Sequence, residues 1–139
     1  MKFQKFGNTY MVRMDKGEEV MEQLGILCKA EKITLAQVSA LGAADHVVVG
    51  VYDLPNKAYH WEELDAFMEI AGLTGSVTMM NDQPYFHLHG TFADTHNVIH
   101  GGHVKEIRIG ATCEMFLTIV EGEVTREYDP TLGINLWKL

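Results

Sequence analysis

Histidines separated by one residue give this sequence its strongest chemical signal. His87 and His89 lie in the apolar run Tyr85–Gly90. On a β-strand, side chains two positions apart point to the same face, with their Cα atoms about 7 Å apart. Neutral imidazole is a good ligand for zinc and other transition metals. The spacing therefore predicts two ligands of one metal ion, and the simpler alternative is that both are ordinary polar residues of a half-exposed strand.

Two more histidines follow, on either side of a glycine pair. His100 and His103 flank Gly101-Gly102, and glycine allows backbone conformations and close approaches that a Cβ atom would block. A neighbouring strand could therefore bring His103 to the face that carries His87 and His89. Three histidine ligands leave at least one coordination position of the ion open. We predict a site for a divalent metal, with zinc as first choice, formed by His87, His89 and His103; His100 could replace His103 if the turn directs it inward.

The remaining histidines show no such pattern. His46, His60 and His96 stand apart from one another, and we interpret each as a surface or locally bonded histidine. Glu114 lies within an apolar, β-like run. It either faces solvent or is a buried acid that needs a partner, and in the second case it could accept a hydrogen bond from a metal-bound imidazole.

Short β-rich runs are the elements that must position these side chains. Asn81–Pro84 has the composition of a turn between the run ending at Met80 and the run Tyr85–Phe92, which predicts an antiparallel pair. The runs expected to form further strands, by their β-branched and aromatic content or by alternation, are Thr9–Met14, His46–Asp53, Lys57–Glu62, Arg108–Val120, Val124–Tyr128 and Ile134–Leu139.

One helix is expected near the N-terminus. Asp15–Glu18 has the spacing of a capping box, and Val20, Leu24 and Leu27 then recur at helical intervals on one face. The fold class that follows is α+β, a mostly antiparallel sheet packed with one main helix. Its length of 139 residues suits a single domain over 1–139.

Charge and composition exclude several classes of function. The sequence has 11 Lys and Arg residues and 19 Asp and Glu residues, so its net charge is −8. It contains no basic cluster of the kind that binds nucleic acid. No apolar run is long enough to cross a membrane and no signal peptide is visible, so we expect a cytoplasmic protein without membrane partners. Cys28 and Cys113 are isolated in apolar surroundings, and we interpret both as reduced core residues.

Four sequence blocks together are similar to the signature of a known family. They are Glu69–Ser76, His87–Asp94, Gly101–Val104 and Ala111–Glu114. Their order and spacing resemble the plants-and-prokaryotes-conserved (PPC) domain family across nearly the whole chain. The resemblance implies an α/β domain that forms trimers, and prokaryotic members usually consist of this domain alone.

In plant nuclear proteins of this family the domain follows AT-hook motifs, and bacterial members are often labelled DNA-binding by analogy. This chain has no Arg-Gly-Arg-Pro hook. It also carries Ala66-Phe67-Met68 where the plant proteins have Gly-Arg-Phe. The cationic side chain at that place is missing, so a plant-type partner contact is not expected.

Three functions are compatible with these observations. The first is a homotrimeric metal-binding domain with a regulatory or small-ligand-binding role. The second is a metal-dependent enzyme that acts on a small molecule through the three-histidine site, since an open position can polarise a carbonyl or lower the pKa of bound water. The motif His-x-His also occurs in cupin-type enzymes, but Asp94 stands where their glutamate is expected. The third is DNA binding, which the charge opposes.

Overall fold

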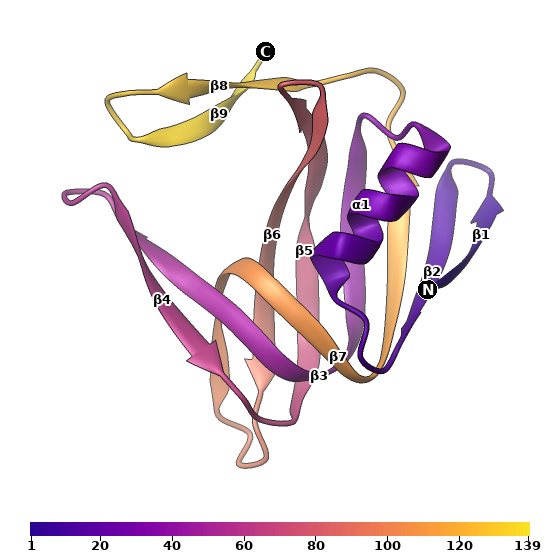
Figure 1. Ribbon diagram of the computed structural model, residues 1–139, viewed down its shortest axis with the longest axis vertical. Coiled ribbons are helices and arrows are strands. Elements are labelled where there is room, and N and C mark those ends of the chain that lie inside the picture. Colours follow the sequence, from indigo (N-terminus) through magenta and orange to yellow (C-terminus); the bar gives the residue numbers. More distant parts are fainter.

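The computed structural model describes residues 1–139 as nine strands and one helix (Figure 1). In chain order these elements are β1 (Lys2–Phe6), β2 (Thr9–Asp15), α1 (Val20–Glu31), β3 (Ala36–Asp53), β4 (Ala58–Leu64), β5 (Met68–Met80), β6 (Gln83–Ala93), β7 (Ile99–Ile119), β8 (Thr125–Asp129) and β9 (Ile134–Lys138). Helix α1 is neither long enough nor apolar enough to cross a membrane.

The expected α+β class is wrong, because the protein is mainly a β-sheet structure. Strands contain 67% of the residues and helix only 9%. Strands β3 and β7 extend over 18 and 21 residues and pair with each other along most of their length. Most of the core is therefore built by long strands that pack on one another, and the single helix covers only part of it.

The pairing of four strands forms a closed circuit. Strand β3 pairs with β5 and β7, β5 pairs with β6, and β6 pairs with β7. All of these pairings are antiparallel, including the predicted pair on either side of Asn81–Pro84. The only parallel contact joins Met79 of β5 to Thr125 of β8. Because β6 and β7 close the circuit, residues of the two histidine motifs lie on neighbouring strands.

Bulges bend the long strands, so that each strand pairs with different neighbours on either side of the bend. The pairing of β3 with β7 changes register between Gly42 and Ala44. Gly42 has a φ of +154°, and a Cβ atom there would lie 2.2 Å from the carbonyl oxygen of Thr112. Bulges increase local twist and redirect a strand. Beyond the bends, β3 pairs with β4, and β7 turns to meet β6.

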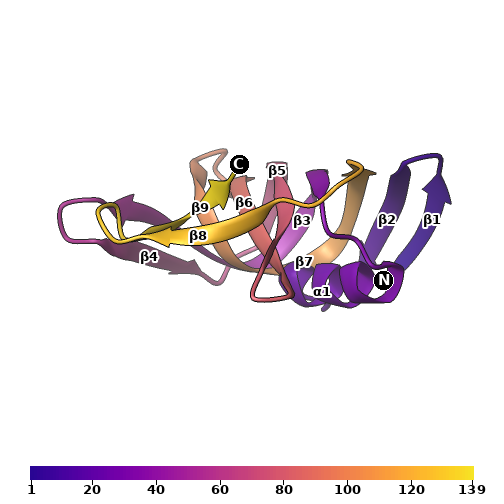
Figure 2. The same cartoon turned by 90° about the horizontal axis from the view of Figure 1, so that it is seen from above.

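The N-cap of helix α1 lies four residues after Asp15, the N-cap that the capping-box spacing predicts. The N-cap is Glu19, whose carboxylate accepts a hydrogen bond from the backbone N–H of Glu22 at 2.7 Å. Glu18 instead accepts from the backbone N–H of Asp15 at 2.8 Å, within the turn before the helix. The predicted apolar spacing holds, because the helix face that includes Val20 is buried against β7 and β6 (Figures 1 and 2).

Both cysteines are buried and unpaired, as predicted. Burial raises the pKa of Cys28 to about 12, and burial together with the nearby charge of Glu114 raises that of Cys113 to about 12. Neither thiol ionises near neutral pH, so neither is a nucleophile or a thiolate ligand.

The C-terminal hairpin β8–β9 lies above the turn between β3 and β4 in Figure 1 and in front of β4 in Figure 2. Two hydrogen bonds hold it to the end of β3 and to the turn that follows β3. The hydroxyl of Tyr52 donates to the carbonyl of Leu132 at 2.8 Å, and Nζ of Lys57 donates to the carbonyl of Pro130 at 2.6 Å. The hairpin therefore forms one wall of a space whose other walls are β4, β6 and β7.

Candidate metal centre

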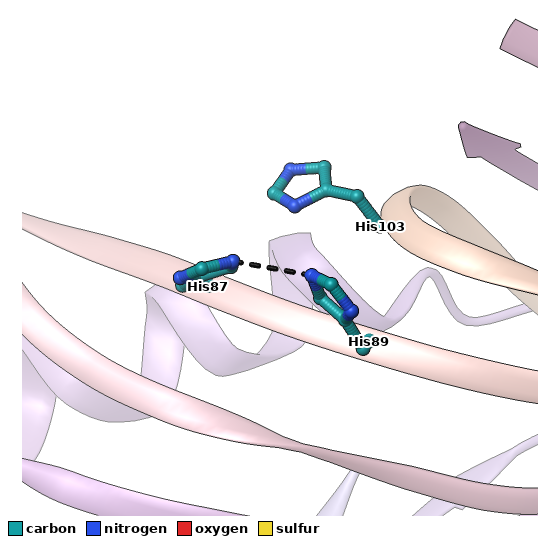
Figure 3. Close-up of side chains that lie close together, drawn as sticks. All are labelled: His87, His89 and His103. Atoms are coloured by element: carbon teal, nitrogen blue, oxygen red, sulfur yellow. Dashed lines mark hydrogen bonds between the residues drawn. The ribbon is translucent and has the colours of Figure 1, made fainter. Parts of the chain in front are cut away.

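The three predicted ligands converge in the structure. His87 and His89 project from β6, and His103 projects from β7 at the position paired with His89. The Nε2 atoms of His87 and His89 are 3.2 Å apart, and one potential ligand atom from each of the three residues lies within 4.8 Å of the others. Figure 3 shows the three rings around a common gap.

This donor set fits one tetrahedral metal ion. Two nitrogens bound to tetrahedral zinc would be about 3.3 Å apart, close to the 3.2 Å between His87 and His89. Nδ1 of His103 is buried without a hydrogen-bond partner, and one ring nitrogen of His103 is directed toward the other two rings (Figure 3). Buried polar atoms are rarely left unpaired. A metal ion held by all three imidazoles would satisfy this nitrogen.

The surroundings of His103 and His87 favour the neutral form of each imidazole, as their lowered pKa values indicate. Burial lowers the pKa of His103 to about 4, and the neighbouring charges of His87, His89 and Arg126 act in the same direction. The pKa of His87 is also lowered, first by burial and then by Arg126 and His89. Since metal ligation requires an unprotonated nitrogen, these two imidazoles have little proton competition at pH 7.

The glycine pair acts as the sequence predicts, by allowing strands to approach closely at the site. Gly102 has a φ of +154°, and a Cβ atom on it would lie 2.6 Å from the carbonyl oxygen of Gly50. A Cβ atom on Gly101 would lie 2.4 Å from the carbonyl oxygen of Gly90. Strand β7 is thus packed tightly between β3 and β6 immediately before His103.

The two uncertain residues of the sequence analysis lie outside the cluster. Nε2 of His100 is 3.2 Å from a carboxylate oxygen of Asp94, which directs this ring away from the site. Backbone N–H groups of Val98 and His96 hold the pKa of Asp94 below its usual value. Glu114 is exposed and forms no hydrogen bond to a candidate ligand. Neither His100 nor Glu114 therefore belongs to the three-histidine cluster.

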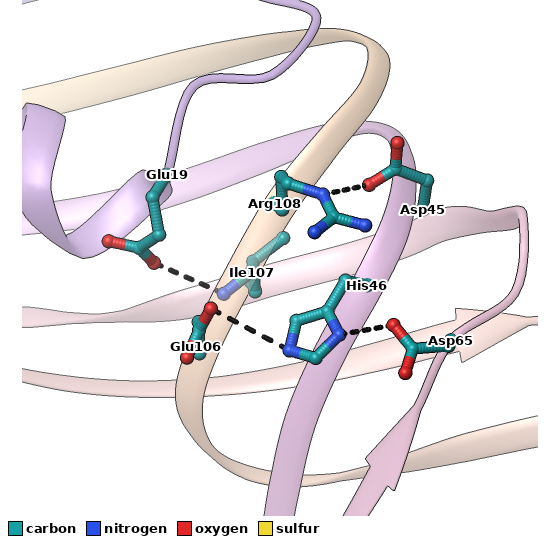
Figure 4. Close-up of polar contacts among 7 residues, drawn as sticks. All are labelled: Glu19, Asp45, His46, Asp65, Glu106, Ile107 and Arg108. Carbon is teal, nitrogen blue, oxygen red and sulfur yellow. Dashed lines mark hydrogen bonds and ion pairs between the residues drawn. The ribbon is translucent and has the colours of Figure 1, made fainter.

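The other histidines are locally bonded or exposed, as predicted. Nδ1 of His46, a residue only 8% exposed, is 2.7 Å from a carboxylate oxygen of Asp65, and its Nε2 is 3.6 Å from Glu106 (Figure 4). His60 is exposed and bonds to Asp53 at 3.0 Å.

Potential ligand atoms of His46, Glu63 and Asp65 also lie within 4.8 Å of one another. Both carboxylates of this second group are exposed. Asp65 and Glu106 already pair with the two ring nitrogens of His46, so this group needs no metal.

A cavity of about 180 Å³ adjoins the histidine cluster and contains residues that the sequence analysis did not select. His87 and His103 form one side of it, and Tyr59, Tyr85, Arg126 and residues 133–135 line the remainder. The rings of Tyr59 and His103 are 4.9 Å apart. Strand alternation could have found Tyr85, two positions before His87, whereas Arg126 follows no motif and reaches the site only through the tertiary fold.

The chain belongs to the Plants and Prokaryotes Conserved domain family, whose sequence profile matches residues 1–121. This confirms the resemblance inferred from the sequence. No curated protein matches the chain significantly.

Several solved structures share the whole fold. A metal-containing protein from Archaeoglobus fulgidus is 31% identical, with a TM-score of 0.90 and coverage of 100% of both chains. A provisionally assigned DNA-binding protein from Bacteroides thetaiotaomicron is 28% identical, with a TM-score of 0.95 and coverage of 99% of this chain and 96% of that one. A PPC protein from Pyrococcus horikoshii is 24% identical, with a TM-score of 0.88 and coverage of 99% and 95%.

Proposed function

We propose that this protein is a metal-binding domain with a regulatory or small-ligand-binding role, and that His87, His89 and His103 hold one divalent metal ion. The observation that carries the proposal is the convergence of three imidazoles, with ligand atoms within 4.8 Å and one buried nitrogen that has no partner. A shared cation would give this nitrogen a partner and would join the three rings.

Zinc is the first choice of metal. An all-imidazole donor set suits zinc, copper, nickel and iron, and zinc accepts tetrahedral geometry without preference from its filled d shell. The A. fulgidus relative, which is 31% identical over its full length, is a metal-containing protein. That relationship supports a metal in this chain without identifying the element.

Metal analysis of tag-free protein tests the proposal. We expect about one metal per chain in the wild type by inductively coupled plasma mass spectrometry, in line with a three-histidine site. The His87→Ala/His89→Ala double variant should lose it, because only one ligand remains. His60→Ala is the matched control, since this exposed histidine pairs only with Asp53. Equal metal content in the wild type and the double variant would refute the site.

A metal-dependent enzyme acting on a small molecule is the second candidate. The observation in its favour is the cavity of about 180 Å³ beside His87 and His103. A metal with an open position can polarise a carbonyl or lower the pKa of bound water, while the cavity walls would bind and orient the substrate. Turnover that stops on chelation and returns with zinc favours the enzyme; ligand binding without turnover favours the binding domain.

A further inference from the structure

Arg126 is the one cationic side chain in the wall of the cavity beside the histidine cluster. It lies on β8, beyond residues 1–121 that match the family profile. The C-terminal hairpin therefore adds a positive charge to a site that is otherwise formed within the matched region.

The guanidinium of Arg126 is fixed on two of its three nitrogens. Nε donates to Oγ1 of the buried Thr78 at 2.8 Å, and Nη1 donates to the carbonyl of Asn135 at 2.9 Å. The ring of Tyr85 lies against it, with 4.4 Å between Cζ and the ring centroid. Nη2 is buried and has no partner. The guanidinium is therefore fixed in position, and Nη2 is its one nitrogen without a hydrogen-bond partner.

No carboxylate of the chain neutralises this guanidinium. The arginines that form ion pairs are Arg13, with Asp15, and Arg108, with Asp45. Burial lowers the pKa of Arg126, and it faces imidazoles rather than acids. A half-buried cation with an unpaired N–H is unfavourable unless something compensates it. A compact anion in the cavity would supply both the charge and the acceptor.

We propose that Arg126 is the anion-binding end of a ligand pocket, and that the ligand is a small organic carboxylate. This inference rests on the proposed metal site. One carboxylate oxygen accepts from Nη2 of Arg126, and a second oxygen of the same molecule occupies the open position at the three-histidine centre. A cavity of about 180 Å³ admits only a small molecule.

The donors favour a carboxylate over a phosphate. A carboxylate has two oxygens, one for each of the two contacts, whereas the additional oxygens of a phosphate would lack donors because Arg126 has only Nη2 free. The walls formed by Tyr59 and Tyr85 offer aromatic faces to the remainder of a short organic molecule. The pocket thus has one anion contact, one metal contact and an apolar side.

Acetate is the probe for the test, because its two oxygens can serve both contacts. Protein loaded with Co²⁺ is titrated with sodium acetate at constant ionic strength, with perchlorate as the balancing ion, and binding is followed by the visible cobalt absorption. We compare the wild type with Arg126→Gln, Arg126→Lys and Arg13→Gln. The last variant removes the same charge from an exposed position outside the cavity.

We expect wild type and Arg13→Gln to bind acetate equally, and Arg126→Gln to bind it about tenfold or more weakly, as for loss of a charge-assisted hydrogen bond. Arg126→Lys, which keeps a cation, should fall between them. Equal acetate affinity in wild type and Arg126→Gln overturns the proposal. If circular dichroism shows that Arg126→Gln is unfolded, Arg126→Lys takes its place. An acetate affinity of Arg126→Lys below that of Arg13→Gln then supports the proposal, and an equal affinity overturns it.

Cobalt content, measured on the same samples, separates this inference from the metal proposal. Full loading with unchanged acetate affinity in Arg126→Gln refutes the anion role alone. Absence of cobalt from the wild type refutes the metal site. In that case the anion role of Arg126 is tested on metal-free protein. Acetate is added to the wild type and to Arg126→Gln, the nuclear magnetic resonance shifts of both are compared, and equal shifts overturn the role.

Discussion

The partner of each imidazole distinguishes the candidate ligands from the other histidines. His46, His60 and His100 each have a carboxylate oxygen within 3.2 Å. His87, His89 and His103 instead face one another, and no acid lies against them in the structure. A carboxylate holds a histidine as a local ion pair or hydrogen bond, whereas a group of imidazoles without acids needs a cation to join it.

His103 and His100 should therefore differ sharply in their effect on metal affinity. We expect His103→Ala to weaken zinc binding by more than the 10–100-fold that loss of an outer partner typically costs, because a direct ligand is removed. His100→Ala should leave zinc affinity unchanged, since its ring bonds to Asp94. Competition titration with a chromophoric chelator measures both. A larger loss in His100→Ala would show that the loop rearranges around the metal.

The part of this site that depends on local strand geometry can be predicted from the sequence, whereas the part that depends on tertiary contacts cannot. His87 and His89 share a face because strand periodicity is a local property. His103 was predicted as the third ligand, but His100 could not be excluded, because its position depends on its contact with Asp94 across a turn. Arg126 could not be found at all, since no motif links β8 to the histidines. Long-range pairing, rather than residue type, determines those positions.

At the scale of elements, every strand except β1 was predicted in place, but the lengths of the long strands were not. The runs His46–Asp53 and Arg108–Val120 form parts of β3 and β7, which are 18 and 21 residues long. Bulges interrupt alternation at points such as Gly42 and Ala44, so one bent strand resembles two short ones in the sequence. That loss of continuity led to the incorrect α+β class.

Gly102→Ala should destabilise the closure of β7 against β3 and β6. The new Cβ atom would meet the carbonyl oxygen of Gly50 at 2.6 Å, and the φ of +154° is unfavourable for alanine. We expect a loss of about 1–3 kcal/mol in the free energy of unfolding. Urea denaturation with chelator present measures it without a contribution from metal.

Gly25→Ala in helix α1 is the matched control. The nearest atom to its added Cβ is Cε2 of Phe86 at 4.0 Å, and its φ lies outside the left-handed region. Alanine is a better helix former, so this variant should gain about 0.5–1 kcal/mol. If both substitutions changed stability in the same direction, close strand approach would not explain the glycine at position 102.

At the scale of the whole molecule, one surface exposes apolar side chains that a monomer would leave in water. Leu41 is 57% exposed and Phe116 is 51% exposed, and both line a hollow of about 600 Å³ that also includes His89. Phe116 continues into a second hollow beside Phe3 and Met11. Contiguous apolar surface of this kind is typical of an assembly interface.

We expect the protein to form the homotrimer that the family resemblance implies. Closed symmetric assembly would bury Phe116 and Leu41 against neighbouring copies. Light scattering should give the mass of three chains for the wild type and a smaller mass for Phe116→Glu. Val51→Glu is the control, because Val51 is 66% exposed and lines neither hollow. A wild type that remains monomeric at micromolar concentration would exclude the trimer.

The charge distribution of the whole molecule leads us to predict that the chain alone does not bind duplex DNA at physiological salt. Its net charge is −8. Of its cations, Arg13, Arg108 and Lys138 pair with acids, and Arg126 faces the cavity. DNA affinity depends on counterions released by cations that reach phosphates, and at about 150 mM salt screening acts within about 8 Å.

Anisotropy of labelled duplexes over a salt series should show binding, if any, only at low salt and with a shallow slope. Sequence-specific retention at about 150 mM would contradict this argument and favour the DNA-binding assignment of the B. thetaiotaomicron relative.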